Sequence, residues 1–332
     1  MFIMRYKSTL SPLGYELDAG DVLFKSPQKV MESGIFLPLD DYIDNNTKHT
    51  EWEKFPKVIM DAGRNAEGQQ IIPISYTFPV IAYPKEIFDY TPDRLLSWTD
   101  MLTDPELAPF SVDLVNCNDY IEYPQGDPFY RYKEYFEFVI GQNVDYKEGK
   151  LLFTEEELLQ RIKDVLALNS EDVYPEAEEG LLGIQHRSYS QPVTLLPLYS
   201  DDGGITARID FYAAVNRNTD SPEEAFAVID RLLSTEAQQN FKLYSEYLCP
   251  YMFEDFPMVD DLYKKGTPIR LHANEENYTE FSELHEQITH AHFMGETSVI
   301  LNELLIQCAS MPDITEQLVH EAYMNLQRRV RE

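Results

Sequence analysis

The chain has 332 residues, and its 43% hydrophobic and 26% charged residues are typical of a folded globular protein of about two domains. A net charge of −31 argues against a nucleic-acid partner, because phosphate binding needs a basic surface. No run of about 18 apolar residues is present, which argues against a transmembrane segment, and the first residues lack the pattern of a signal peptide.

Near the N-terminus, the pattern predicts a strand, a helix, a glycine stop and a second helix. The strand is expected at residues 21–24 (DVLF), and the helix after it should end at Gly34. Glycine adopts the left-handed conformation that often ends a helix. The passage LPLDDYI then restarts a helix on Asp40, because an acidic residue favours a helix N-terminus.

Strands and helices alternate along the rest of the chain. The expected strands lie at residues 71–83, 110–116, 179–185 and 207–218, and the expected helices at 92–103, 153–169, 221–247 and 313–330. The helix-start signals are Pro92, the capping box of Thr154 and Glu157, and Ser221 with Pro222 and Glu224. This alternation predicts an α/β architecture with mostly parallel sheets.

The sequence gives no specific support for catalysis or for a metal site. It contains no nucleophile elbow, phosphate-binding loop or dinucleotide-binding fingerprint. In HEQITH, His285 and His290 are five residues apart, so on a regular helix they would point about 140° apart and could not share one zinc ion. Cys117, Cys249 and Cys308 have neither metal nor disulfide spacing. We therefore predict no catalytic residue, no metal and no cofactor, and expect that the protein is not an enzyme.

Four passages, in this order, resemble the family 1 extracellular solute-binding proteins. They are DAGDVLFKS…MESGIFLPLDDYID, GRNAEGQQIIPISYTFPVIAYPKEIFDY…PDRLLSWTDML, VTLLPLYSDDGGITARIDFYAAVNRNTDSPEEAFAVIDRLLSTEAQQNF and ITEQLVHEAYMNLQRRV. That family comprises the sugar-binding subunits of ABC importers and includes maltose-binding-protein-like members. Two positions depart from its pattern: Tyr83-Pro84-Lys85 stands where the family has Tyr-Asn-Lys, and Gly20-Asp21 where it has Pro-Asp.

The resemblance implies a periplasmic-binding-protein-like fold of type II, with two α/β lobes joined by a hinge. The N-lobe would take residues 1–106 and 207–268, and the C-lobe residues 107–206 and 269–332. Because the family has further strands before the passages matched here, the N-lobe is expected to be incomplete. Residues 1–17 or a second molecule would then cover the gap, and the N-lobe would be the less stable half.

By the same resemblance, the protein would bind a carbohydrate between its lobes and deliver it to ABC permease subunits. It would be a bacterial extracellular protein, either a lipoprotein or periplasmic. Two alternatives remain open: a glycoside-processing enzyme, which would need two carboxylates about 5–10 Å apart, and a degenerate lobe used for protein interactions.

Ligands of open α/β sheets bind beyond the carboxyl ends of strands, and pockets favour domain interfaces. Residues at such ends are therefore the candidate ligand-binding residues, with one tryptophan added because its ring could stack on a sugar. They are Lys25, Ser26, Trp52, Tyr76, Thr77, Asn116, Asn118, Gln185, His186, Arg187, Tyr189 and Asp202.

Overall fold

A computed structural model describes residues 2–5, 26–110, 135–168, 178–181, 192–234, 237, 280, 283–293 and 295–331; at 2–5, 77, 81–82, 178–181 and 210–211 only the backbone is described. The strands are β1 (Phe2–Arg5), β2 (Arg64–Asn65), β3 (Gly68–Gln69), β4 (Ile71–Thr77), β5 (Pro79–Pro84), β6 (Val144–Asp145), β7 (Lys150–Leu151), β8 (Glu178–Leu181), β9 (Val193–Pro197), β10 (Ile205–Ala214) and β11 (Ile288–Phe293). The α-helices are α1 (Pro27–Glu32), α2 (Asp40–Asn46), α3 (Lys57–Asp61), α4 (Trp98–Thr103), α6 (Glu155–Leu166), α7 (Pro222–Leu232), α11 (Glu296–Ser310) and α12 (Thr315–Arg331). Short 3-10 turns lie at Trp52–Lys54 and Pro312–Ile314, and a π-helix, η2, at Tyr135–Val139.

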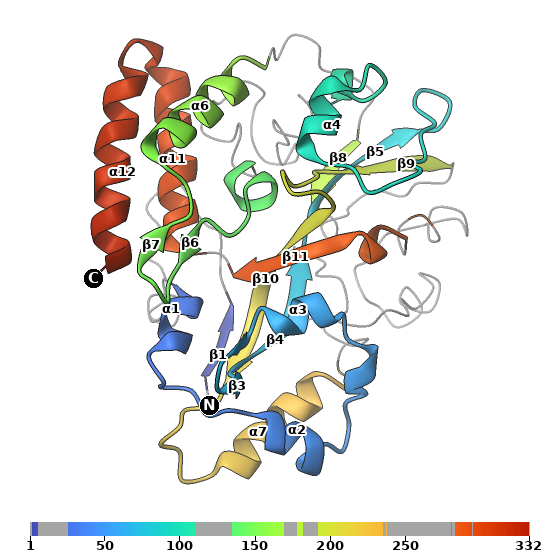
Figure 1. Cartoon of the computed structure of the whole chain (residues 1–332). Helices are drawn as coiled ribbons and strands as arrows, with labels where there is room; N and C mark the ends of the chain where they lie inside the picture. The colour runs from blue at the N-terminus through green and yellow to red at the C-terminus, as the bar shows by residue number, and fades with distance from the viewer. Residues whose placement is uncertain are drawn as a thin grey trace, which may run out of the picture.

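The long strand β10 organises the first sheet (Figure 1). Its second half lies between β1 and β4, both antiparallel to it, with Ala214 opposite Phe2 on one side and Ile71 on the other. Its first half pairs in parallel with β11, beginning with Ile205 opposite Ile288. Residues 2–5 thus pair with this sheet, whereas the strand expected at residues 21–24, beside which a gap was predicted, lies outside the described residues.

The second sheet has the order β8-β5-β9, and β5 is antiparallel to both neighbours. Phe78 alone separates β4 of the first sheet from β5 of the second, so the chain crosses between the sheets at this residue. The expectation of mostly parallel sheets is wrong for the described strands, where only β10 and β11 pair in parallel. The physical reason is the path of the chain: a strand that runs from one sheet toward the other is paired with a strand that runs in the opposite direction, so the pair is antiparallel.

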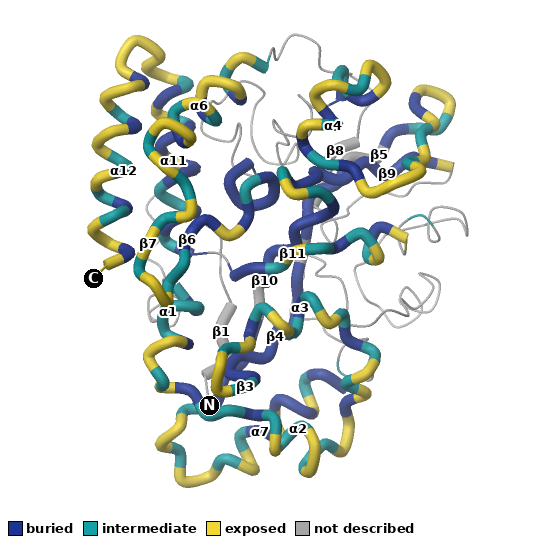
Figure 2. Tube along the Cα trace, in the orientation of Figure 1, coloured by how far each residue is buried: buried dark blue, intermediate teal, exposed yellow. Residues whose placement is uncertain are grey.

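Helices cover the two sheets at opposite ends of the molecule (Figure 1). Helices α6, α11 and α12 pack together on one side, and α2 and α7 contact each other at the far end of the first sheet. The predicted apolar face of α12 is largely confirmed: Val319, Leu326 and Val330 are buried, and Tyr323 is half-buried. Figure 2 shows β4 and β10 buried wherever their side chains are described, whereas β11 also carries intermediate and exposed residues, and many exposed residues lie on the outer helices. No described helix has the length and hydropathy needed to cross a bilayer.

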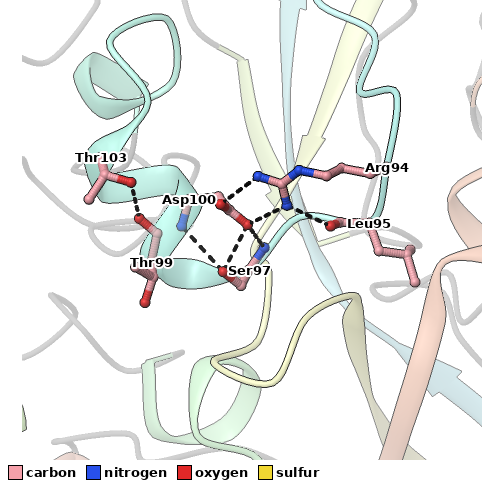
Figure 3. Close-up of polar contacts among 6 residues, drawn as sticks. All are labelled: Arg94, Leu95, Ser97, Thr99, Asp100 and Thr103. Carbon is pink, nitrogen blue, oxygen red and sulfur yellow. Dashed lines mark hydrogen bonds and ion pairs between the residues drawn. The ribbon is translucent and has the colours of Figure 1, made fainter.

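The start of α4 differs from its prediction. The helix begins at Trp98 after the N-cap Ser97, not at Pro92. Ser97 and Asp100 form a capping box, in which the side chain of each accepts a hydrogen bond from the backbone N–H of the other (Figure 3). The Ser97 backbone N–H donates to Asp100 Oδ2 at 2.8 Å, and the Asp100 N–H donates to Ser97 Oγ at 3.3 Å. The Arg94 guanidinium donates to both carboxylate oxygens of Asp100. These hydrogen bonds, together with the one from the Ser97 backbone N–H, hold the Asp100 pKa well below its usual range.

Other local predictions have mixed outcomes. The first helix, α1, ends before Gly34, whose φ is 72°, and α2 begins at Asp40, as expected. The capping box of α6, formed by Thr154 and Glu157, is confirmed. At α7 the position of Ser221 is right, but its side chain makes no capping hydrogen bond, so the predicted box with Glu224 does not form.

Candidate functional site

The place where the chain passes between the two sheets is the candidate site. Three passages meet there: Phe78 between β4 and β5, the middle of β10, and the segment from β11 to α11. Polar side chains lie at each passage, although most of the surrounding residues are apolar and buried. Buried polar groups normally have a structural or functional reason.

At the first passage, Tyr76 contacts His285, which lies just before β11. The Tyr76 hydroxyl and His285 Nδ1 are 2.8 Å apart, and the Tyr76 residue is 0% exposed. The imidazole also meets the Phe78 ring edge-on, with centroids 5.3 Å apart. Burial lowers the pKa of His285 to about 3, so this histidine is neutral at physiological pH.

At the second passage, Arg208 of β10 forms an ion pair with Glu137 of the π-helix. Arg208 Nη1 and Glu137 Oε2 are 3.6 Å apart, and both side chains are buried. The Arg208 guanidinium also lies 5.4 Å from the centroid of the Phe138 ring. His292 is the register partner of Arg208 on β11. Burial, and then the charge of Arg208, lower the pKa of His292 to about 4, against a hydrogen bond with the Glu137 backbone.

A glycine turn over residues 200–204 leads into β10. Gly204 has a φ of 79°, and a Cβ there would lie 2.5 Å from Thr289 Oγ1, so only glycine fits. Asp201 forms an ion pair with Arg161 of α6. The neighbouring Asp202, a predicted site residue, is exposed at the tip of this turn.

Two predicted ligand-binding aromatics pack against other side chains of the protein: Tyr76 is buried and Trp52 is half-buried. Tyr76 is fully buried against His285. Trp52 donates from Nε1 to Thr47 Oγ1 at 2.7 Å, and its ring stacks on Phe226 of α7 at 6.3 Å. An aromatic ring presents a large apolar surface, which was expected to stack on a sugar. In this structure the two rings contact other side chains of the protein instead.

The other candidates divide by location. Ser26 is the N-cap of α1, and its Oγ lies 3.4 Å from the hydroxyl of Tyr146 instead of capping the helix. Thr77 is the last residue of β4, directly before the crossover at Phe78. The remaining candidates lie outside the described residues: Lys25, Asn116, Asn118, Gln185, His186, Arg187 and Tyr189.

Sequence reasoning missed Glu137, Arg208 and Tyr146. A signal existed for the first: Glu137 is the single charge in the run YFEFV, whereas Arg208 shares the strand pattern ITARIDFY with Asp210. A lone charge inside an apolar run marks a buried group that needs a partner. Tyr146 carries no comparable signal, because its importance comes from a contact with a residue 120 positions away.

The histidines of HEQITH lie on different elements. His285 belongs to a short helical turn, whereas His290 lies on β11 with its Nδ1 2.9 Å from Thr289 Oγ1. Within the described part of the chain, no cluster of three or more histidine, cysteine or acidic side chains could hold a metal ion.

Comparison with protein-family models and with curated proteins finds no match. Solved structures do match. An extracellular solute-binding protein of family 1 from Alicyclobacillus acidocaldarius has a TM-score of 0.53 at 13% identity, over 89% of this chain and 82% of that one. A cyclic α-maltosyl-1,6-maltose binding protein from Arthrobacter globiformis has a TM-score of 0.52 at 13% identity, over 92% and 82%. A periplasmic oligogalacturonide binding protein from Yersinia enterocolitica has a TM-score of 0.52 at 12% identity, over 92% and 82%.

At these identities the likeness establishes the fold. The first sheet built on β10, the second built on β5 and the strands that pass between them agree with a two-lobed architecture. The chain therefore has the α/β fold of the periplasmic and extracellular solute-binding proteins, as its resemblance to family 1 implied.

Proposed function

We propose that this protein is the substrate-binding component of an ABC importer, and that it binds an oligosaccharide between its two lobes and delivers it to a permease. The observation that supports this most is the shared fold over about nine tenths of the chain with proteins described as binding cyclic maltosyl-maltose and oligogalacturonide. In such a fold, a ligand that contacts both lobes stabilises the closed arrangement.

We further propose that the lobes divide at the crossovers. Phe78 would be the first hinge, because β4 pairs with β10 whereas β5 pairs with β8 and β9. This moves residues 79–106 from the N-lobe, where the sequence interpretation placed them, to the C-lobe. The backbone N–H of Trp98 in this stretch donates to the Ser200 carbonyl at 2.9 Å, which supports that assignment.

The proposed ligand contacts are the predicted candidates other than Tyr76 and Trp52, whose side chains have packing partners within the protein. Among the described residues these are Ser26, Thr77 and Asp202, to which we add the seven outside them. Hydroxyl, amide and charged groups can hydrogen-bond sugar hydroxyls, and leaving such groups unpaired rejects the wrong ligand. The proposal includes an extracellular location, with a lipoprotein anchor or in a periplasm.

The chain's charge guides the choice of ligand to test. At −31, the protein repels anionic ligands over long range, so neutral oligosaccharides are the first candidates. A thermal-shift screen with maltooligosaccharides, mannooligosaccharides and oligogalacturonides would test the proposal, followed by calorimetry on any hit. We expect one neutral series to raise the melting temperature, and the rise to grow with the logarithm of ligand concentration above the Kd. No stabilisation by any series, with the protein folded, would overturn the carbohydrate assignment.

The same samples separate binding from hydrolysis. A binding protein leaves each oligosaccharide intact after prolonged incubation, as chromatography would show. Reproducible release of shorter sugars, abolished by one Asp or Glu substitution, would instead establish the enzyme alternative.

A further inference from the structure

Two segments on opposite sides of the proposed division contact each other away from the hinge. Helix α1 belongs with the first sheet, whereas the β6–β7 hairpin and the end of α12 belong with the helices of the other side (Figure 1). The Tyr146 hydroxyl in the hairpin lies 3.4 Å from Ser26 Oγ, and Lys29 Nζ lies 3.3 Å from the Arg329 carbonyl oxygen.

The α1 side of this contact is fixed to the first sheet. Asn65 Nδ2 of β2, which leads through β3 into β4 of the first sheet, donates to the Met31 carbonyl at 3.4 Å. After the helix, the Leu37 N–H donates to the Val215 carbonyl at 2.8 Å, directly beyond the end of β10. Movement of the first sheet would therefore carry α1 with it.

The opposite side of the contact is equally well anchored. Gly149, with a φ of 62°, brings the hairpin turn against the Val330 carbonyl of α12, which would lie 3.6 Å from an added Cβ. The Tyr323 hydroxyl donates to the Phe153 carbonyl at 3.4 Å, which ties α12 to the chain after the hairpin. The Arg329 side chain forms an ion pair with Glu296 of α11.

The contact between Lys29 and the Arg329 carbonyl is of a kind that can form and break reversibly. The last four carbonyl groups of a helix have no partner within it and carry the negative end of its dipole, so they attract an ammonium group. Arg329 is two residues from the end of α12. Both contacts lie near solvent, where such interactions are individually weak and can be released.

We propose that Lys29, the Arg329 carbonyl, Tyr146 and Ser26 form an interlobe latch that stabilises the closed arrangement of the lobes. The link to ligand affinity rests on the proposed function, whereas the latch itself rests on these contacts and on the proposed division of the lobes. Since a ligand that needs closed lobes loses affinity when the closed state is less populated, the latch sets part of the ligand affinity without touching the ligand.

The test is a distance measurement across the lobes in the ligand-free protein. Amino acids with a keto group would replace Asp44 of α2 and Glu321 of α12, which are both exposed, and spin labels would be coupled to them. This labelling chemistry does not require the native cysteines to be removed. The latch variant is Lys29→Met with Tyr146→Phe, in the full chain. The matched control is Lys57→Met with Tyr90→Phe, which makes the same chemical changes at residues whose partners, Asp61 and the Phe88 ring, lie on their own side of the division.

We expect the latch variant to shift the distance distribution to longer values, while the control keeps the wild-type distribution. Any maltooligosaccharide that binds should bind the latch variant about 3- to 10-fold more weakly than the control. Identical distance distributions in all three proteins would overturn the latch. If no sugar binds the wild type, the proposed function fails, and the distances still decide the latch.

Discussion

Arg208 on the crossing strand β10 and Glu137 in the π-helix form an ion pair that is buried on both sides, with 3.6 Å between nitrogen and oxygen. The pair ties the middle of β10 to the segment at 135–139, which packs against α11. Removing two charges from water is costly, and their mutual attraction offsets that cost only while both partners are present. The pair therefore fixes the position of β10 more than it adds stability.

Replacing one partner of the ion pair should lower the free energy of unfolding far more than replacing both. We expect Arg208→Met to lower the free energy of unfolding by about 3–5 kcal/mol, because it leaves the Glu137 charge buried without this cation. The double variant Arg208→Met, Glu137→Leu should recover much of the loss. Urea unfolding of the single and double variants measures this coupling, and strictly additive effects would contradict the ion-pair account.

Asp230 of α7 anchors the loop after α2, and it is a second position where a substitution should greatly lower the free energy of unfolding. Its carboxylate accepts from the backbone N–H groups of Lys48, His49 and Thr50 at 2.9–3.2 Å, and the residue is 1% exposed. We expect Asp230→Ala to destabilise the protein by about 3–5 kcal/mol, because backbone donors lose a charged acceptor. Asp220→Ala, at an exposed position just before the same helix, should change stability by less than about 0.5 kcal/mol. Equal effects at the two positions would count against the anchoring role.

Tyr76 was expected from the sequence to contact ligand, and its burial changes that expectation. We now expect Tyr76→Ala to lower the free energy of unfolding by about 3–5 kcal/mol, because a fully buried aromatic side chain is replaced by a cavity. Ligand affinity of the variant that remains folded should stay within about twofold of wild type. Calorimetry below the melting temperature tests this, and a large loss of affinity with unchanged stability would restore the original interpretation.

The parts of the fold that depend on neighbouring residues could be predicted from the sequence. The stop at Gly34, the restart at Asp40 and the capping box of α6 are local, so sequence order is enough. The start of α4 was misplaced because Pro92 is a generic helix-start signal, while Asp100 selects Ser97 through specific hydrogen bonds.

The candidate site was less predictable because distant residues build it. The Tyr76 contact with His285 spans 209 positions, and the Arg208 ion pair with Glu137 joins β10 to the π-helix. Periodicity also could not tell that β5 pairs with β8 and β9 instead of continuing the sheet of β4, since one residue, Phe78, separates the two strands. Consequently, which side chains at the strand ends face inward depended on the tertiary structure.

The two buried histidines should make the fold sensitive to acid. Burial lowers the pKa of His285 to about 3 and of His292 to about 4, from an ordinary value of 6.5. Well above pH 6.5 both histidines are neutral in the folded and unfolded chains, so they contribute no pH dependence. As the pH falls through 6.5, the unfolded chain binds protons that the folded protein cannot accept, and stability falls until the pH reaches the folded pKa.

We therefore expect each histidine to remove about 1.4 kcal/mol of stability between pH 7.5 and 5.5, a range in which few carboxylates titrate. His292→Gln should make the dependence of unfolding free energy on pH shallower by about that amount, whatever its effect on absolute stability. His49→Gln, at an exposed side chain, is the matched control and should keep the wild-type slope. Urea unfolding at several pH values gives these slopes. Equal slopes in wild type and His292→Gln would show that His292 is protonated in the folded protein, which the burial of its ring beside the positive charge of Arg208 argues against.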